Sequence, residues 1–287
     1  MGDFKVSNEK IAQAISLLTN VYNNPDEKTF IKAKTLIEQA AQFKSYTVPV
    51  RADKVKKEAM EFYQSDTPWL DEWIGGGVRR KEVVLIGGIP YSGKTHLLIW
   101  LAARYAEAKI AHFYGEDLQG DVKRYYERAG GKQFLKNAWL VGMQDYAFTA
   151  KMVEQVIEQL AKEGNKPDIV VLDHVDIMGS SLFSRADWED ATGVVREVKV
   201  MAGRQDVMVF AASQLHEKSR ERKGMARFYR AKIGKSSNAD IILMVDDVAG
   251  NEYRMSRQKA KGRDLSSDSS EKTLDVDWSR MTVEDIT

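Results

Sequence analysis

The sequence predicts an α/β fold, in which helices flank a mostly parallel, twisted sheet and a short helical arm precedes it. From about residue 66 to 278, short apolar runs alternate with amphipathic helical stretches, which is typical of a parallel sheet covered on both faces. Residues 1–64 are instead polar, poor in glycine and helical in periodicity. We therefore expect an arm at 1–64 and one larger domain at 65–287.

The arm contains two helical repeats and a third, weaker one. Apolar residues recur at three- and four-residue steps in two sets, Ile11, Ala14, Ile15 and Leu18, then Phe30, Ala33, Ile37 and Ala40. A turn signal at 23–26 separates them, and 55–63 reads as a short charged helix. A plain helical appendage and an oligomerisation element both fit this pattern.

The larger domain shows seven strand-length runs and four helical patterns. The runs lie at 82–86, 110–114, 138–141, 168–173, 207–212, 240–245 and 253–258, and the helices at about 93–107, 119–129, 149–163 and 185–204. The strand-rich end from about 240 predicts closing or antiparallel edge strands. The acidic, polar stretch 264–277 predicts a solvated loop.

Composition excludes several kinds of site. The 287 residues carry 43 Lys and Arg against 42 Asp and Glu, so any nucleic-acid site depends on local clustering. The absence of cysteine excludes disulfides, zinc ribbons and thiol nucleophiles, and it fits a reducing compartment. The apolar runs are too short to span a bilayer, so we expect a cytoplasmic protein without a membrane partner.

The strongest motif is Gly88-Ile-Pro-Tyr-Ser-Gly-Lys-Thr95, which matches the phosphate-binding pattern G-x-x-x-x-G-K-[ST] between a strand and a helix. Glycines let backbone N–H groups surround a polyphosphate, and the helix N-terminus faces the same anion. The motif predicts ATP and Mg²⁺ as cofactors. The residues expected at the nucleotide are Gly88, Ile89, Pro90, Tyr91, Ser92, Gly93, Lys94, Thr95 and His96.

Polar residues follow three other predicted strands, at the edge where open α/β sheets bind ligands. Asp173 ends a buried run and is expected to hold Mg²⁺ together with Thr95. Glu116 and Asp117 are alternative candidates for activating water. Gln214 closes another run, where its amide could sense the γ-phosphate.

A basic segment at 216–235 contains eight Lys or Arg and two Glu, with two aromatic residues among them. It fits a phosphate backbone or a solvated charged surface. Its candidate DNA-binding residues are Lys218, Arg220, Arg222, Lys223, Arg227, Arg230, Lys232 and Lys235.

In order and spacing, these motifs resemble the RecA-like P-loop ATPase core of hexameric replicative DNA helicases of the DnaB type, including the helicase half of phage primase–helicases. The resemblance covers about 67–278. Its features are the lead-in LDEWIGGG, the P-loop, Glu116, the run DIVVLDHVDIM and the run FAASQL. It departs from the family at 259–261, where Lys-Ala-Lys replaces the usual Lys-x-Arg.

The resemblance implies roles for several residues. Glu116 becomes the catalytic glutamate, Gln214 the γ-phosphate sensor, and 216–235 the central-channel loop that holds single-stranded DNA. The basic finger inserted into the neighbouring subunit's site would be Arg263, Arg257 or a lysine such as Lys261. Lys94 completes the expected catalytic set.

The function implied is an ATP-dependent replicative helicase that forms a hexameric ring on single-stranded DNA and couples hydrolysis to unwinding. Its partners could include a separate primase, polymerase or loader, and a phage origin would place it in the bacterial host cytoplasm. Without cysteine, a primase with a cysteine zinc module is excluded. Two alternatives stay open: a RecA/RadA-type recombinase or mediator filament, and a nucleotide-gated switch that binds DNA or protein.

Overall fold

The computed structural model divides the chain into two compact units, residues 1–59 and 60–287. It describes residues 12–19, 26, 29–34, 37, 62–143, 148–179, 187–215, 238–249, 251–263, 265 and 270–286. In the first unit, 12–19 and 29–34 are helical, as the periodicity predicts. Ala14 and Ala33 are fully buried there, whereas Ile15 and Phe30 are at least half exposed.

The second unit is built on a sheet of nine described strands in the order β11-β10-β9-β8-β3-β7-β6-β4-β5. Their bounds are β3 Val83–Gly88, β4 Ile110–Tyr114, β5 Ala138–Gly142, β6 Ile169–Asp173, β7 Met208–Gln214, β8 Ile241–Ala249, β9 Glu252–Ala260, β10 Glu271–Asp277 and β11 Thr282–Asp285. The strands β3 to β8 pair in parallel, and β9 to β11 extend the sheet antiparallel. The predicted, mostly parallel sheet with antiparallel edge strands is confirmed.

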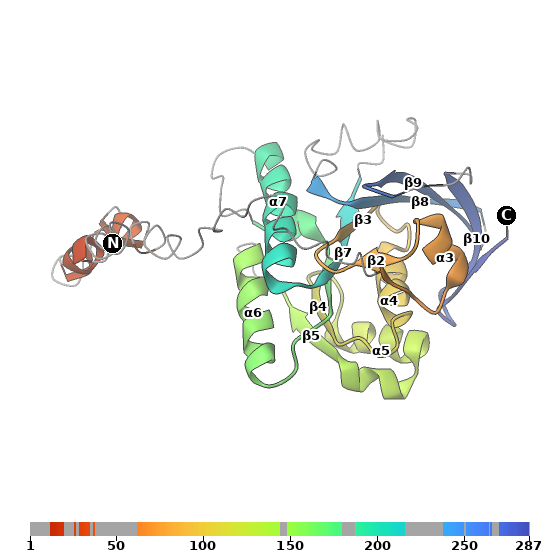
Figure 1. Ribbon diagram of the computed structural model, residues 1–287, viewed down its shortest axis with the longest axis horizontal. Coiled ribbons are helices and arrows are strands. Elements are labelled where there is room, and N and C mark those ends of the chain that lie inside the picture. The colour runs from red at the N-terminus through yellow and green to blue at the C-terminus, as the bar shows by residue number, and fades with distance from the viewer. Residues whose placement is uncertain are drawn as a thin grey trace, which may run out of the picture. The chain divides into compact units, whose positions relative to one another are not determined.

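Helices cover both faces of this sheet (Figure 1). The long helices are α4 Lys94–Ala103, α5 Gln119–Gly130, α6 Ala150–Lys162 and α7 Asp187–Gln205. The chain steps outward from β3 to β4 and β5, then back to β6 and β7. Because such crossovers are right-handed, this reversal puts α4 and α5 on one face and α6 and α7 on the other.

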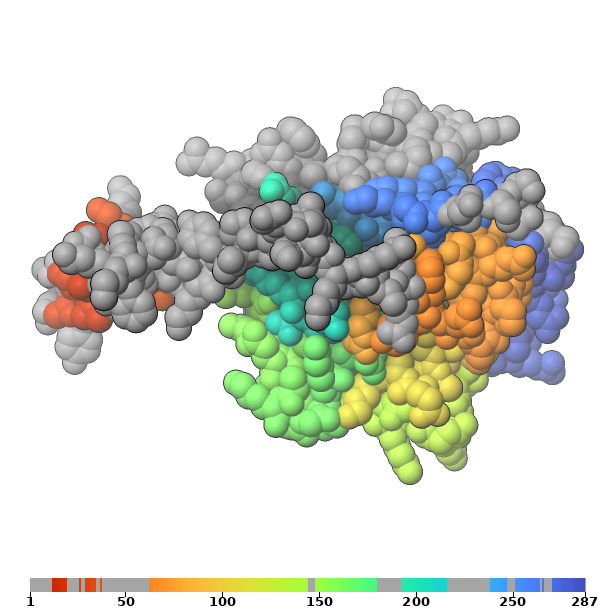
Figure 2. Space-filling view, in the orientation of Figure 1, coloured from red at the N-terminus to blue at the C-terminus, as the bar shows by residue number. Residues whose placement is uncertain are grey.

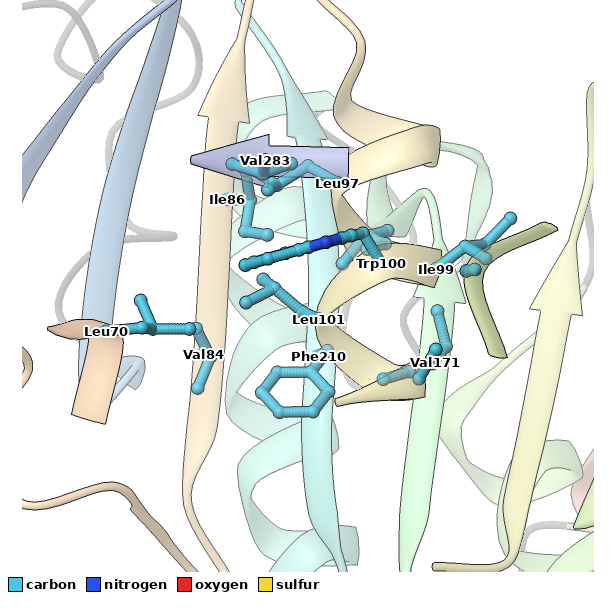
Figure 3. Packing of buried hydrophobic residues seen from close by; sticks show 14 of the residues in the cluster. Leu70, Val84, Ile86, Leu97, Ile99, Trp100, Leu101, Val171, Phe210 and Val283 are labelled. Carbon is cyan, nitrogen blue, oxygen red and sulfur yellow. The ribbon is translucent and has the colours of Figure 1, made fainter. Parts of the chain in front are cut away.

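The core beneath α4 holds the P-loop helix against the middle of the sheet. Figure 3 shows Trp100 and Leu101 of α4 packed over Ile86 of β3 and Phe210 of β7, with Val283 of β11 beside them. All five are at most 7% exposed. Burying each large apolar side chain contributes about 1.5–3 kcal/mol, so the start of α4 is anchored firmly relative to the strand ends.

Two predictions about the ends of this domain were wrong. The stretch 264–277 is not wholly a loop, because 271–277 form β10, in which Leu274 and Val276 are buried. Alternation of these apolar residues with acids is the pattern of an edge strand with one buried face. The predicted helix at 55–63 ends instead in a strand, β1 Phe62–Tyr63, which pairs with β2 Val78–Arg79; its residues 55–61 lie outside the described part.

A short helix, α3 Pro68–Trp73, begins the lead-in that precedes β3. Figure 2 shows this lead-in, in orange, beside the blue C-terminal strands, although some 170 residues or more separate them in sequence. Among the described residues, no helix has both the length and the apolar character needed to cross a membrane.

Candidate nucleotide site

The P-loop lies between β3 and α4 in a conformation that only particular residues adopt easily. Gly93, at the N-cap of α4, has a φ of 74°, and Tyr91 has a φ of 62°. Tyr91 is 99% exposed, whereas the neighbouring Ser92 is 1% exposed, and its hydroxyl has no hydrogen-bond partner among the described residues. A buried hydroxyl without a partner is costly, and a bound phosphate oxygen would satisfy it.

Lys94 is buried at the start of α4, and its ammonium group donates to the Ile89 carbonyl across the loop at 2.7 Å. Burial lowers the pKa of Lys94, and the carboxylates of Asp173 and Glu116 oppose that shift. The positive charge is therefore held close to two acids, in the position where the motif requires a counter-charge for phosphate.

The registers of the parallel strands bring the predicted polar residues to one edge of the sheet. Gly88 on β3 pairs with Gln214 on β7, and Tyr114 on β4 pairs with Asp173 on β6. Glu116 follows Tyr114 by two residues. The carboxyl ends of four strands thus place the P-loop, Asp173, Glu116 and Gln214 along the same edge.

Asp173 and Thr95 form the pair that could hold a magnesium ion. The Thr95 side chain hydrogen-bonds the Asp173 carboxyl group. Burial raises the pKa of Asp173, whereas that hydrogen bond, His174 and Lys94 counteract the rise. A hydroxyl and a carboxylate beside a phosphate loop are the oxygen donors that Mg²⁺ takes in nucleotide sites, so the residues fit this ion. No cluster of three His, Asp or Glu suited to a metal occurs among the described residues.

The two candidate acids for activating water differ in their surroundings. The Glu116 side chain is 70% exposed, and its Oε1 lies 3.1 Å from Nε2 of His174. Asp117 is less open, and burial together with Asp121 and Glu116 raises its pKa. Glu116 is therefore the acid that combines access to solvent with a hydrogen-bond partner in the site.

Sequence reasoning missed His174 and Asp176. Nδ1 of His174 lies 3.2 Å from Oδ2 of Asp176, within ion-pair distance but without hydrogen-bond alignment. The same oxygen of Asp176 accepts a hydrogen bond from the backbone N–H of Gln214 at 2.7 Å. The polar residues of the run Asp-His-Val-Asp directly after a buried strand were the available signal.

Sequence reasoning also missed the aromatic residues beside the P-loop. His96 of α4 lies between Tyr125 and Trp278, with ring centroids 4.4 Å and 5.3 Å away. Trp278 Nε1 donates to the Tyr253 hydroxyl at 3.0 Å. Burial and the positive charge of Arg128 lower the pKa of His96. Trp278 escaped notice because it follows 264–277, which was interpreted as a loop.

The two predicted finger residues occupy different positions. The Arg263 side chain is fully buried and forms an ion pair with Glu82. It also donates to the carbonyls of Gly75 and Gly77 and lies over the ring of Phe62. Both terminal nitrogens of Arg263 are thus engaged within the chain, whereas Lys261 is exposed. As the finger candidate, Lys261 is therefore preferred to Arg263.

The eight basic residues predicted to bind DNA lie outside the described residues. They are Lys218, Arg220, Arg222, Lys223, Arg227, Arg230, Lys232 and Lys235. The described chain stops at the end of β7 and resumes at 238, just before β8. Their role in DNA binding stays a prediction.

No model of a known protein family matches the chain. Among curated proteins, it is similar to the DNA repair protein RadA of Mycobacterium tuberculosis, with 28% identity over 134 residues. This match covers 46% of this chain and 25% of the relative. RadA of Campylobacter jejuni is 27% identical over 155 residues, which cover 53% of this chain and 32% of that protein. The chain therefore spans about a quarter to a third of these relatives.

Two solved structures share the fold over most of the chain. An isolated ATPase domain of a DnaB-like helicase has a TM-score of 0.66 and 14% identity, with 91% of this chain and 100% of that chain covered. A DnaB-like replicative helicase, whose structure was described with its interactions with primase, has a TM-score of 0.61 and 15% identity. That match covers 94% of this chain and 75% of the helicase. The expected RecA-like core of the DnaB type is thus confirmed as the fold.

Proposed function

We propose that the chain is an ATP-driven motor on DNA, which hydrolyses ATP and uses the energy to move along single-stranded DNA and unwind duplex. The observation that carries the proposal is the single edge where Lys94, the hydrogen-bonded pair Thr95 and Asp173, and Glu116 meet. This edge supplies a phosphate cradle, metal ligands and an acid for water. The shared fold of DnaB-like ATPase domains supports the choice of motor.

The proposed hydrolysis assigns one task to each residue. The P-loop amides and Lys94 bind the β- and γ-phosphates, and Thr95 with Asp173 would hold Mg²⁺. The bound ion would neutralise charge on these phosphates. Glu116 orients the attacking water and accepts its proton, which yields ADP and inorganic phosphate. A basic residue of a neighbouring protomer, for which Lys261 is our candidate, stabilises the charge that develops.

Coupling to DNA is proposed to pass through the end of β7. Gln214 lies at that end, next to the P-loop strand β3, and the basic segment 216–235 follows it directly. A hydrogen bond to the γ-phosphate that breaks on hydrolysis would shift the start of the segment. We infer that this segment binds single-stranded DNA, in a ring of subunits that in other proteins of this fold is hexameric.

Steady-state ATP hydrolysis with and without single-stranded DNA tests the proposal. We expect turnover that DNA stimulates, abolished by Lys94→Ala and strongly reduced by Glu116→Gln, which keeps nucleotide binding. Lys132→Ala and Glu127→Gln are matched controls, because they alter only a surface pair with a 3.8 Å separation, worth at most about 1 kcal/mol. Wild-type turnover by the Lys94→Ala variant would refute the nucleotide site, and turnover insensitive to DNA would favour the switch module.

A second candidate function is a recombinase or recombination mediator that assembles on DNA without unwinding it. The similarity to RadA over roughly half of the chain favours it. A forked-duplex assay and electron microscopy with ATP and DNA separate the two candidates. The motor predicts strand separation by closed rings, and the mediator predicts filaments without strand separation.

A further inference from the structure

One buried histidine connects three functional elements of the site. Its Nε2 atom lies 3.1 Å from Glu116 Oε1, and its Nδ1 atom lies 3.2 Å from Asp176 Oδ2. The His174 side chain is 8% exposed, whereas that of Glu116 is 70% exposed. The ring is thus held by the protein interior, and it is a described polar side chain that restrains an otherwise solvent-exposed carboxylate.

The backbone explains why this ring meets Glu116. His174 follows β6 and caps the short 3-10 helix η3 Val175–Ile177, which Val175 anchors in the core at 1% exposure. The N–H of Gly115 donates to the Asp173 carbonyl at 3.1 Å. A β-carbon at Gly115 would come within 1.9 Å of Ile177 Cδ1, so glycine permits the close approach of the two loops.

The other side of the ring leads to β7. Asp176 Oδ2, which faces His174 Nδ1, also accepts the backbone N–H of Gln214 at 2.7 Å. The contacts therefore run from Glu116 through His174 and Asp176 to Gln214. Gln214 is the last residue of β7, two positions before the basic segment 216–235.

We propose that His174 is a positioning residue, which holds the Glu116 carboxylate where it orients water and connects it through Asp176 to the end of β7. This inference rests on the proposed ATP hydrolysis. It assigns no chemical step to His174 itself. Movement of Gln214 on loss of the γ-phosphate would then displace the ring and Glu116 together.

Two amide replacements separate the two sides of the ring. His174→Gln can place an N–H near the Nε2 position and so keep the contact with Glu116, whereas His174→Asn reaches only the Nδ1 position. We expect His174→Ala and His174→Asn to lower kcat for ATP by roughly 10-fold to 100-fold, as loss of an outer partner of a functional group does. His174→Gln should recover most of that loss. KM for ATP and the affinity for a fluorescent ATP analogue should change little.

Asp176 provides the second arm of the test. Asp176→Asn keeps an oxygen for the Gln214 N–H, and Asp176→Ala removes it. We expect Asp176→Ala to reduce the ratio of DNA-stimulated to basal turnover at least several-fold, and Asp176→Asn to retain that ratio. Equal ratios in both variants and the wild-type protein would overturn the connection to β7.

The outcomes distinguish this inference from the proposed function. If Glu116→Gln stops turnover while His174→Ala keeps the wild-type kcat, the positioning role is refuted and the ATPase stands. If Glu116→Gln itself turns over at the wild-type rate, the proposed catalytic role fails. A fall in ATP-analogue affinity shared equally by His174→Ala, His174→Asn and His174→Gln would show a purely structural role and would also overturn the inference.

Discussion

The indole ring of Trp278 lies directly against the α-carbon of Gly93, where a β-carbon would come within 2.9 Å of Nε1. This contact joins the turn after β10 to the P-loop, and the hydrogen bond from Trp278 to the Tyr253 hydroxyl holds the ring in place. The glycine in the motif is therefore required twice, once for its φ of 74° and once for the approach of this ring.

Gly93→Ala should consequently weaken ATP binding. A left-handed φ costs a non-glycine residue about 1–2 kcal/mol, and the displaced loop carries Lys94. Titration with a fluorescent ATP analogue measures the loss, for which Gly120→Ala is the control because it has open space and an ordinary φ. In a Trp278→Ala background, Gly93→Ala should cost less; an equal cost in both backgrounds would show that the ring contact is irrelevant.

A buried histidine predicts how stability depends on pH. His112 is fully buried on β4, its Nδ1 lies 3.0 Å from the Tyr126 hydroxyl, and burial lowers its pKa to about 3. Because the unfolded value is about 6.5, the unfolded chain binds the extra proton between these limits. His112 thus contributes its full stability above about pH 6.5, and the contribution is lost as the pH falls toward 3.

Between pH 7 and pH 5 this histidine should cost about 2 kcal/mol of unfolding free energy. Urea unfolding of the wild-type protein and of His112→Gln, which keeps a polar partner for Tyr126, isolates the effect. The variant should lose less stability over this range. Identical pH dependence of the two proteins would contradict the assignment.

Arg263 and Lys261 should separate stability from activity. Arg263→Ala leaves Glu82 buried without its guanidinium partner and should lower the free energy of unfolding by about 3–5 kcal/mol. Lys261 is exposed, so Lys261→Ala should leave unfolding unchanged and reduce ATP turnover of the assembled protein. A stable Arg263→Ala variant that lacks turnover would instead assign the finger to Arg263.

The basic segment should determine how salt affects DNA binding. Replacing Arg220, Arg222 and Arg227 together with alanine should weaken single-stranded DNA binding. For each phosphate that is no longer neutralised, the slope of log K against log salt should fall by about 0.7. Anisotropy titrations at several salt concentrations measure both, with Lys151→Ala plus Lys162→Ala on exposed positions of α6 as the control. An unchanged slope would place the DNA site elsewhere.

Local patterns were enough to predict the sheet, the four long helices and the P-loop. Buried parallel strands read as continuous apolar runs, and the phosphate motif needs only eight consecutive residues. The polar residues after each strand could also be placed at one edge, because the carboxyl ends of parallel strands meet there. The edge strands β10 and β11 were missed because their one buried face leaves only a few apolar residues among acids.

What the sequence alone determined is therefore the set of elements and the position of the phosphate loop. The tertiary structure decided which distant residues meet: Trp278 with Gly93, Arg263 with Glu82, and His174 with Glu116. These contacts depend on the order of the strands and on side-chain packing across the sheet. The free energies that fix that order come from contacts between residues far apart in the chain, and no local periodicity carries them.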